Sequence, residues 1–190
     1  MGDPDIDIPG DGKLSKASDP SAPLMVVFGG VDVSTIPSGQ YMWNYMNTIK
    51  NRFHIFVAQS NAVNGPHSYR SLMSTLKAQG LTPSKQILYL FSGGYRPGMD
   101  LLVGGGPALF SSIYLVDIWM GGTQVPDFYK ALVDANTAKI TYVYTTFGAN
   151  NGKARDYIAN KLGSQRATLV EGKGMPVHMS TNTVAVRTIQ

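Results

Sequence analysis

The sequence predicts a three-layer α/β/α sandwich whose mostly parallel central sheet has about six strands. Along residues 23–190, apolar runs alternate with segments of helical periodicity, which is the pattern of βαβ units. The runs are hydrophobic at consecutive positions, as expected of parallel strands that helices cover on both faces. No repeat and no linker interrupts this pattern, so we expect one domain over 23–190, preceded by an extended N-terminal arm over 1–22.

Six apolar runs are the expected strands. In chain order they lie at 23–30, 53–60, 85–94, 111–122, 139–148 and 167–174. The first run, PLMVVFGG, and the third, KQILYLFSGG, end in Gly-Gly, which lets the chain turn sharply or approach a ligand. In the arm, which is rich in Asp, Pro, Gly and Ser, a short edge strand is expected at 6–8.

Segments with helical spacing follow the runs. They lie at 40–52, 68–80, 97–110, 125–136, 152–163 and 180–189. In the first of these, one face carries Met42, Tyr45, Met46 and Ile49. We expect the aromatic and methionine residues of this segment to be core rather than a ligand site, namely Tyr41, Met42, Trp43 and Tyr45. The segment 97–110 is expected to be short or irregular, because it begins with Pro97-Gly98 and contains three further consecutive glycines.

Composition excludes several classes of function. Hydrophobic residues make up 43% of the 190 residues and charged residues 15%, which indicates a globular chain. The net charge of +4 is spread along the chain, so no nucleic-acid partner is expected. Cysteine is absent, which excludes disulfides, Cys-ligated zinc and thiol catalysis. No run approaches the ~20 apolar residues of a membrane span, and no signal-peptide stretch is visible; compartment and oligomeric state stay open.

Three residue types typical of hydrolytic sites follow three of the expected strands. In an open parallel sheet, ligands gather at the carboxyl ends of the strands. Ser92-Gly93-Gly94 ends the third run, Asp117 lies at the end of the apolar stretch IYLVD, and His178 follows the sixth run through a glycine-rich turn. A serine, an aspartate and a histidine are therefore expected at one edge of the sheet, in that order along the chain.

This order of elements resembles the α/β-hydrolase superfamily, and the chain looks like a small serine esterase or lipase. That family places its nucleophile on a tight strand-to-helix turn, usually Gly-x-Ser-x-Gly. The stretch 90–94, LFSGG, matches the second half of the motif. Gly94 provides the small residue expected two positions after the serine, whereas Leu90 departs from the glycine expected two positions before it.

The resemblance implies that Ser92 attacks an acyl carbon and that His178 removes its proton. The alternative for Ser92 is a helix N-cap, a common use of serine. Of the other histidines, His54 alternates within a strand and is expected to be structural, while His67 precedes the serine in the chain, which the family order disfavours.

Asp117 is the candidate acid that orients the histidine; its alternative is the cap of a turn. In most members of the family the acid follows the next strand, but here that position, 145–148, reads TTFG and offers no carboxylate. Asp156 lies within a helical segment and is expected to be solvated.

The stretch VVFGGVDV resembles the glycine-rich oxyanion loop of the family. The resemblance implies that backbone N–H groups of Gly30 or Val31, together with Gly93, stabilise the negative charge on the reacting carbonyl oxygen. The alternative is a glycine turn without a ligand. Arg96, close to the serine in sequence, either binds a substrate carboxylate or phosphate or is simply solvated.

We therefore expect a serine hydrolase that cleaves a carboxylic ester or amide in a small-molecule or lipid acyl substrate, without metal or cofactor. One alternative is a non-catalytic domain that binds an anion through its glycine-rich loops, an option that Leu90 favours. A third hypothesis concerns context: the proline- and aspartate-rich arm suits the hydrolase domain of a bacterial or phage effector.

Overall fold

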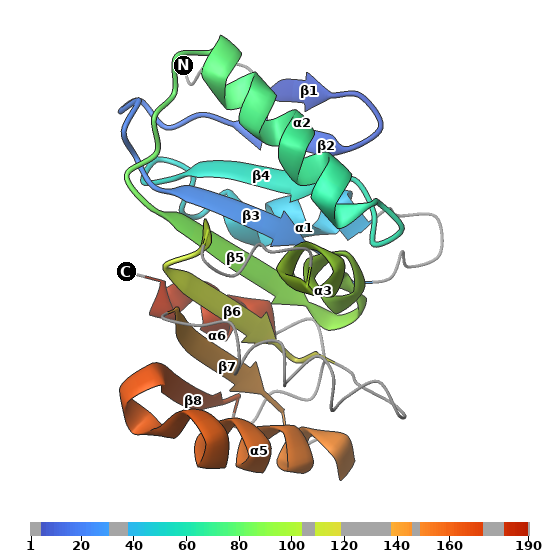
Figure 1. Cartoon of the computed structure of the whole chain (residues 1–190), viewed down its shortest axis with the longest axis vertical. Helices are drawn as coiled ribbons and strands as arrows, with labels where there is room; N and C mark the ends of the chain where they lie inside the picture. The colour runs from blue at the N-terminus through green and yellow to red at the C-terminus, as the bar shows by residue number, and fades with distance from the viewer. Residues whose placement is uncertain are drawn as a thin grey trace.

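The central layer is a single sheet of eight strands. The computed structural model describes residues 5–30, 38–103, 109–118, 138–145, 149–172 and 181–189. The strands are β1 (Ile6–Ile8), β2 (Gly12–Ser15), β3 (Leu24–Phe28), β4 (His54–Ala58), β5 (Gln86–Phe91), β6 (Ser112–Val116), β7 (Lys139–Tyr144) and β8 (Ala167–Glu171). With helices on both faces of this sheet (Figure 1), the predicted three-layer sandwich is confirmed.

The strand order is β1-β2-β4-β3-β5-β6-β7-β8. β2 pairs antiparallel with both of its neighbours, and β3 to β8 are all parallel to one another. β1 is the short edge strand expected at 6–8, and β2 is a further strand within residues 1–22. β2 reads GKLS, which is too short and too polar to stand out as an apolar run.

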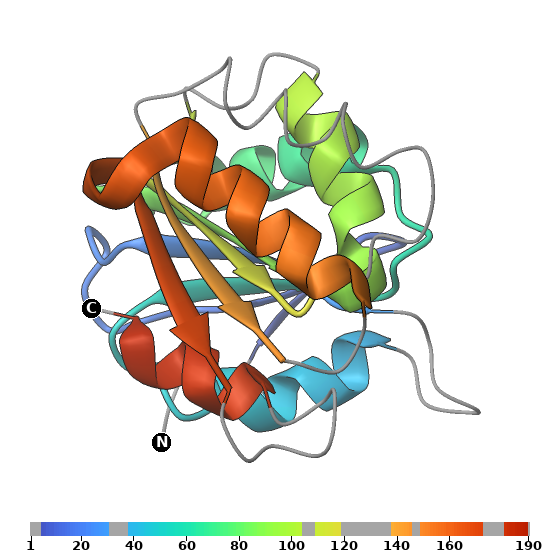
Figure 2. The same ribbon diagram turned by 90° about the horizontal axis from the view of Figure 1, so that it is seen from below.

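The helices form the two outer layers. They are α1 (Ser38–Met46), α2 (Gly65–Ala78), α3 (Tyr95–Val103), α5 (Ala149–Arg166) and α6 (Thr181–Thr188). Figure 2 shows α2, α3 and α5 on one face of the sheet and α1 and α6 on the other. The helix expected at 125–136 lies outside the described residues. None of the described helices is long and apolar enough to cross a membrane.

The local sequence explains the form of two of these helices. α3 begins at Tyr95 and places Pro97 in its first turn, where the missing N–H has no intrahelical acceptor to lose. The helix has nine residues and ends at Val103, so of the two expected alternatives, short or irregular, it is the short one. The helical run of α5 breaks at Gly163, whose φ of +65° suits the expected glycine stop.

Each central strand buries both of its faces. In β3, Leu24, Val26 and Phe28 belong to the core beneath α2, α3 and α5. Met25 and Val27 belong to the core beneath α1 and α6. All five side chains are fully buried. This two-sided burial explains why the strand is apolar at consecutive positions.

His54 has the structural role expected from the sequence. Its side chain is fully buried at the start of β4. Nδ1 accepts a hydrogen bond from the Ala17 N–H at 3.1 Å, so Nε2 carries the ring proton and lies 3.2 Å from Pro20 O, to which it donates. The ring therefore ties the segment after β2 to the sheet.

A buried hydrogen bond anchors α6 to the sheet. Tyr89, in β5, donates from its hydroxyl to Asn182 Oδ1 at 2.6 Å, and both side chains are fully buried. Burial raises the pKa of Tyr89 well above its usual value. The phenol thus keeps its proton and remains a donor at neutral pH.

We expect Asn182→Ala to lower the free energy of unfolding by about 1–3 kcal/mol, because the Tyr89 hydroxyl loses an acceptor inside the core. Urea denaturation followed by circular dichroism measures the change. Adding Tyr89→Phe to Asn182→Ala should recover part of the loss, since the second substitution removes the orphaned hydroxyl. Equal urea midpoints for Asn182→Ala and the wild type would contradict this anchoring role.

Candidate active site

Ser92 lies on a sharp strand-to-helix turn. β5 ends at Phe91, a single 3₁₀ turn covers Ser92–Gly94, and α3 begins at Tyr95. The φ of Ser92 is +50°, a left-handed conformation that costs a non-glycine residue about 1–2 kcal/mol. Its side chain is largely buried, with 7% of the residue exposed.

The backbone argues against the helix-capping alternative for this serine. An N-cap residue has an extended backbone, and its side chain accepts a bond from the first turn. The extended residue before the 3₁₀ turn is Phe91, with φ −114° and ψ 130°, and it makes no side-chain cap. Ser92 is inside the turn and left-handed, so a common capping role does not account for it.

Gly94 allows the turn to pack against β3. A methyl group on Gly94 would lie 2.2 Å from Phe28 O and 2.4 Å from Gly29 O, both backbone atoms. Any larger residue would push the turn away from the end of β3. This close approach is the steric reason for a small residue two positions after the serine.

Gly98 accommodates the bulk of Leu90, the residue that departs from the family motif. Leu90 is fully buried, and a methyl group on Gly98 would lie 2.3 Å from its Cδ2. The missing side chain in α3 therefore leaves the space that Leu90 fills. The sequence marks Pro97-Gly98 only as a pair that shortens or distorts a helix, because a glycine eight residues after a bulky residue is too indirect a signal to reveal this packing.

The glycine-rich loop after β3 lies against the serine. A methyl group on Gly30 would lie 2.9 Å from Ser92 Cβ and 3.2 Å from Ser92 Oγ. The structure thus brings together Gly30 and Ser92, while Val31 lies outside the described residues. Gly93 follows the serine and is half-buried, and Arg96 is exposed in the first turn of α3.

Asp117 lies at the end of the adjacent strand. Phe91 pairs with Val116, so Ser92 and Asp117 each follow a paired residue on neighbouring strands. Asp117 is 4% exposed, and its Oδ1 accepts bonds from the Thr145 Oγ1 at 3.1 Å and the Thr145 N–H at 3.4 Å. Thr145 follows β7, so the carboxylate reaches toward the position where most members of the family carry their acid.

Ser92 and Asp117 share an unusual backbone conformation. In the part of the chain that the structure describes, they are the only non-glycine residues with positive φ, at +50° and +40°. Such residues cluster at functional sites, because the surrounding structure must hold them in place. The two outliers lie on adjacent strands at the edge of the sheet where a ligand is expected.

Tyr142, which sequence reasoning did not single out, borders Asp117. Its ring is fully buried in β7, and its hydroxyl has no hydrogen-bond partner among the described residues. Burial raises the pKa of Tyr142, and the negative charge of Asp117 raises it further. The phenol therefore stays neutral beside the carboxylate. A tyrosine in a strand is an ordinary core residue, so no sequence signal marked it.

The other titratable candidates lie elsewhere or outside the described residues. His178, the expected base, falls in the segment 173–180 and is not described. His67 is at the start of α2, largely exposed, with Nε2 3.7 Å from Asp11 Oδ2. Asp156 is exposed beside Arg155, as expected. The described residues contain no group of three or more His, Cys, Asp or Glu that could hold a metal ion.

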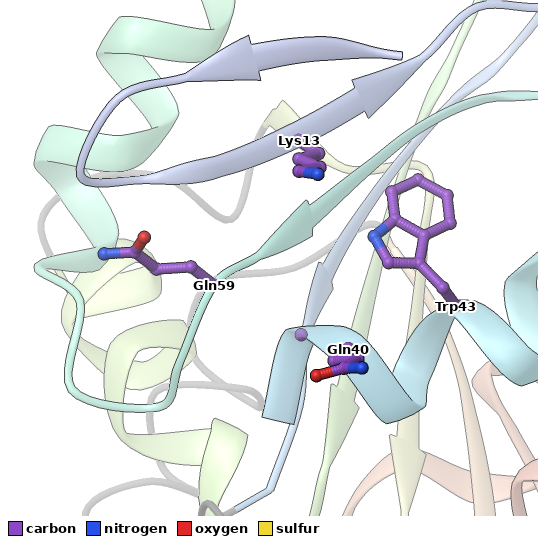
Figure 3. Close-up of a pocket in the computed structure, with 5 residues that line it drawn as sticks. Lys13, Gln40, Trp43 and Gln59 are labelled. Atoms are coloured by element: carbon purple, nitrogen blue, oxygen red, sulfur yellow. The ribbon is translucent and has the colours of Figure 1, made fainter. Parts of the chain in front are cut away.

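A separate pocket of about 340 Å³ lies between α1 and the strands β2 and β4 (Figure 3). The residues that line it are Lys13, Gly39, Gln40, Trp43 and Gln59. The Gly39 N–H donates to Gln59 O at 3.2 Å, which seats the first turn of α1 on the carboxyl end of β4. Because β3 separates β4 from β5, this pocket is distinct from the turn at Ser92.

Comparison by sequence finds no matching family model and no matching curated protein. The structure is similar to Est1E from Butyrivibrio proteoclasticus (12% identity, 98% of this chain and 96% of that chain, TM-score 0.59). It is also similar to the esterase domain of a Rhodothermus marinus protein (11% identity, 93% of this chain and 88% of that chain, TM-score 0.59). A third similar structure is MenH from S. aureus (10% identity, 92% of this chain and 96% of that chain, TM-score 0.62). At these identities the likeness establishes the fold, which is that of the α/β-hydrolases.

The fit between Leu90 and Gly98 can be tested by a double-mutant cycle. We expect Gly98→Ala to lower the free energy of unfolding by about 1–3 kcal/mol, because the new methyl group collides with the Leu90 side chain. In a Leu90→Ala background the same substitution should cost much less, since the space has been vacated. Additive effects of the two substitutions, measured by urea denaturation, would show that the residues do not compensate each other.

Proposed function

We propose that the chain is a serine hydrolase that cleaves a carboxylic ester or amide, with Ser92 as nucleophile, His178 as general base and Asp117 as the acid that orients it. The observation that carries this proposal is the left-handed backbone of Ser92 on its strand-to-helix turn. This conformation is costly, yet it presents a hydroxyl at the carboxyl edge of the sheet. The α/β-hydrolase fold supports the same interpretation.

The proposed reaction proceeds through an acyl-enzyme. Ser92 Oγ attacks the acyl carbon while the imidazole of His178 takes the hydroxyl proton. The carbonyl electron pair moves onto its oxygen and returns as the bond to the leaving group breaks, and the leaving group takes the proton from His178. A water molecule then attacks the acyl carbon of the acyl-enzyme and gives its proton to His178. The carboxylic acid leaves, and Ser92 takes the proton back.

The chain around His178 supports its assignment as base. A methyl group on Gly172, just after β8, would lie 3.8 Å from Thr181 Cγ2 and 3.9 Å from Thr145 Cγ2. Thr145 in turn hydrogen-bonds Asp117. His178 is three residues before Thr181, so covalent geometry limits the separation of their α-carbons to about 11 Å. Thr181, three residues after His178 in the sequence, is thus close to the residue that hydrogen-bonds the carboxylate, which supports the proposal.

Backbone N–H groups are the proposed oxyanion donors. Gly30 lies against the Ser92 side chain, and Gly93 follows the serine at the start of a helical turn. We assign one donor to Gly93 and the other to Gly30 or Val31. Donors of this kind are fixed before the reaction, and the loss of one typically lowers kcat by about 100- to 1,000-fold.

An anion-binding domain without catalysis has less support. Leu90 favoured that alternative, because a bulky residue there was expected to disturb the nucleophile turn. Gly98 relieves the crowding, so Leu90 no longer argues against the elbow. For the substrate we propose a small molecule or lipid that carries an acyl group. Arg96 is exposed in the first turn of α3, where it would bind a carboxylate or phosphate of that substrate.

A fluorophosphonate probe tests the nucleophile. We expect one adduct per chain, located on the peptide that contains Ser92 by mass spectrometry, together with cleavage of p-nitrophenyl esters. Both should disappear in Ser92→Ala, and labelling should be lost in His178→Ala, because the serine then has no base. Ser111→Ala, which alters an exposed serine, is the matched control. Absence of both labelling and ester cleavage in the wild type would leave the anion-binding alternative.

Asp117→Asn tests the acid. Asparagine tolerates the left-handed backbone of this position, so the fold should be retained. The amide cannot stabilise the imidazolium or hold the ring in the required tautomer, and we expect kcat to fall by about 10,000-fold. Thr145→Val, which removes the hydroxyl bonded to Asp117, should have a much smaller effect. An Asp117→Asn variant with near wild-type kcat would exclude Asp117 as the acid.

A further inference from the structure

We propose that the Tyr41 hydroxyl donates a hydrogen bond to the oxyanion that forms when Ser92 attacks its substrate. This role rests on the proposed serine hydrolase function and adds a side-chain donor from α1 to the backbone donors. We expected Tyr41 to be core, and most of its ring does pack in the core beneath α1 and α6. Its hydroxyl, however, lies at the candidate active site.

Gly30 shows where this hydroxyl is. A methyl group on Gly30 would lie 2.9 Å from the Tyr41 hydroxyl oxygen and 3.2 Å from Ser92 Oγ. Both oxygens therefore flank the same glycine, one reaching it from α1 and the other from the end of β5. Tyr41 is 7% exposed, as is Ser92, so both residues are largely screened from bulk solvent.

The order of strands assigns the two sides of the serine. β3, β5 and β6 are neighbours, so Gly30 lies on one side of Ser92 and Asp117 on the other. The side of Asp117 is where an imidazole must lie to relay the proton. The reacting carbonyl oxygen must then point to the opposite side, toward Gly30, because the base and the oxyanion cannot share a position. Tyr41 is on that opposite side.

The surroundings of Tyr41 suit a fixed donor. Its ring packs edge-on against Phe91, with centroids 6.3 Å apart and planes at 85°. This contact fixes the phenol relative to the residue that precedes Ser92. A preorganised donor in a low-dielectric site stabilises developing charge more strongly than water does. Tyr41 keeps its proton throughout: the hydrogen bond strengthens as charge builds on the oxygen and weakens as the carbonyl re-forms.

The test compares Tyr41→Phe with Tyr45→Phe. Both substitutions remove a phenol hydroxyl from α1, and Tyr45 is a partly buried residue that packs against the same core as Tyr41. We expect Tyr41→Phe to lower kcat on p-nitrophenyl esters by about 100-fold, with KM changed by no more than a few-fold, and Tyr45→Phe to match the wild type. Thermal unfolding followed by circular dichroism checks that both variants are folded at the assay temperature.

A second measurement separates catalysis from packing. A trifluoromethyl ketone forms a tetrahedral adduct with the serine, and this adduct carries an oxyanion in the same position. Tyr41→Phe should therefore raise the inhibition constant of the ketone by a factor similar to the loss in kcat. Unchanged kcat and ketone inhibition in Tyr41→Phe, with Ser92→Ala inactive, would overturn the role of Tyr41 and leave the hydrolase intact. A wild-type chain inert to esters and to the ketone would overturn both.

Discussion

The left-handed backbone of Ser92 is the constraint on which the candidate site depends. A non-glycine residue held in this conformation costs about 1–2 kcal/mol, and it persists only where the surrounding structure leaves no alternative. On one side, Phe91 is paired with Val116 inside a sheet whose strands are buried on both faces. On the other, a single 3₁₀ turn must lead directly into α3. The serine therefore has little freedom, and its hydroxyl is presented at the edge of the sheet.

Close backbone packing around this turn explains the placement of three glycines. Gly94 meets backbone oxygens at the end of β3, Gly30 meets the serine side chain, and Gly98 meets Leu90. The last contact shows that the small residue usually found two positions before the nucleophile can be replaced by one in the helix that follows. What the turn requires is enough total space between β5 and α3, and either element can supply it. The motif is thus one solution to a packing problem that this chain solves differently.

The fold was predictable because its signals are local and repeated. Continuous apolar runs and helical spacing predicted the three layers, and the carboxyl ends of the strands placed Ser92 and Asp117 at one edge. β2 was not predictable, because a strand of only four residues is held by pairing with β1 and β4 rather than by its own hydrophobicity. The contacts of Gly98 and Tyr41 were not predictable either, because each joins residues from different elements. Neither periodicity nor a motif encodes such pairs.

The charges near Asp117 favour a cationic partner at that end of the site. Tyr142, next to the carboxylate, is kept neutral because burial and the negative charge of Asp117 both raise its pKa. Ionisation of this phenol would place a second negative charge in the same buried region, and the environment opposes it. Among Asp117 and Tyr142, the carboxylate is therefore the group that carries the negative charge. Thr145 orients its Oδ1 through two hydrogen bonds. In the proposed reaction, a protonated imidazole forms while the serine oxygen is bonded to the substrate, and a negative charge at this position would stabilise that species.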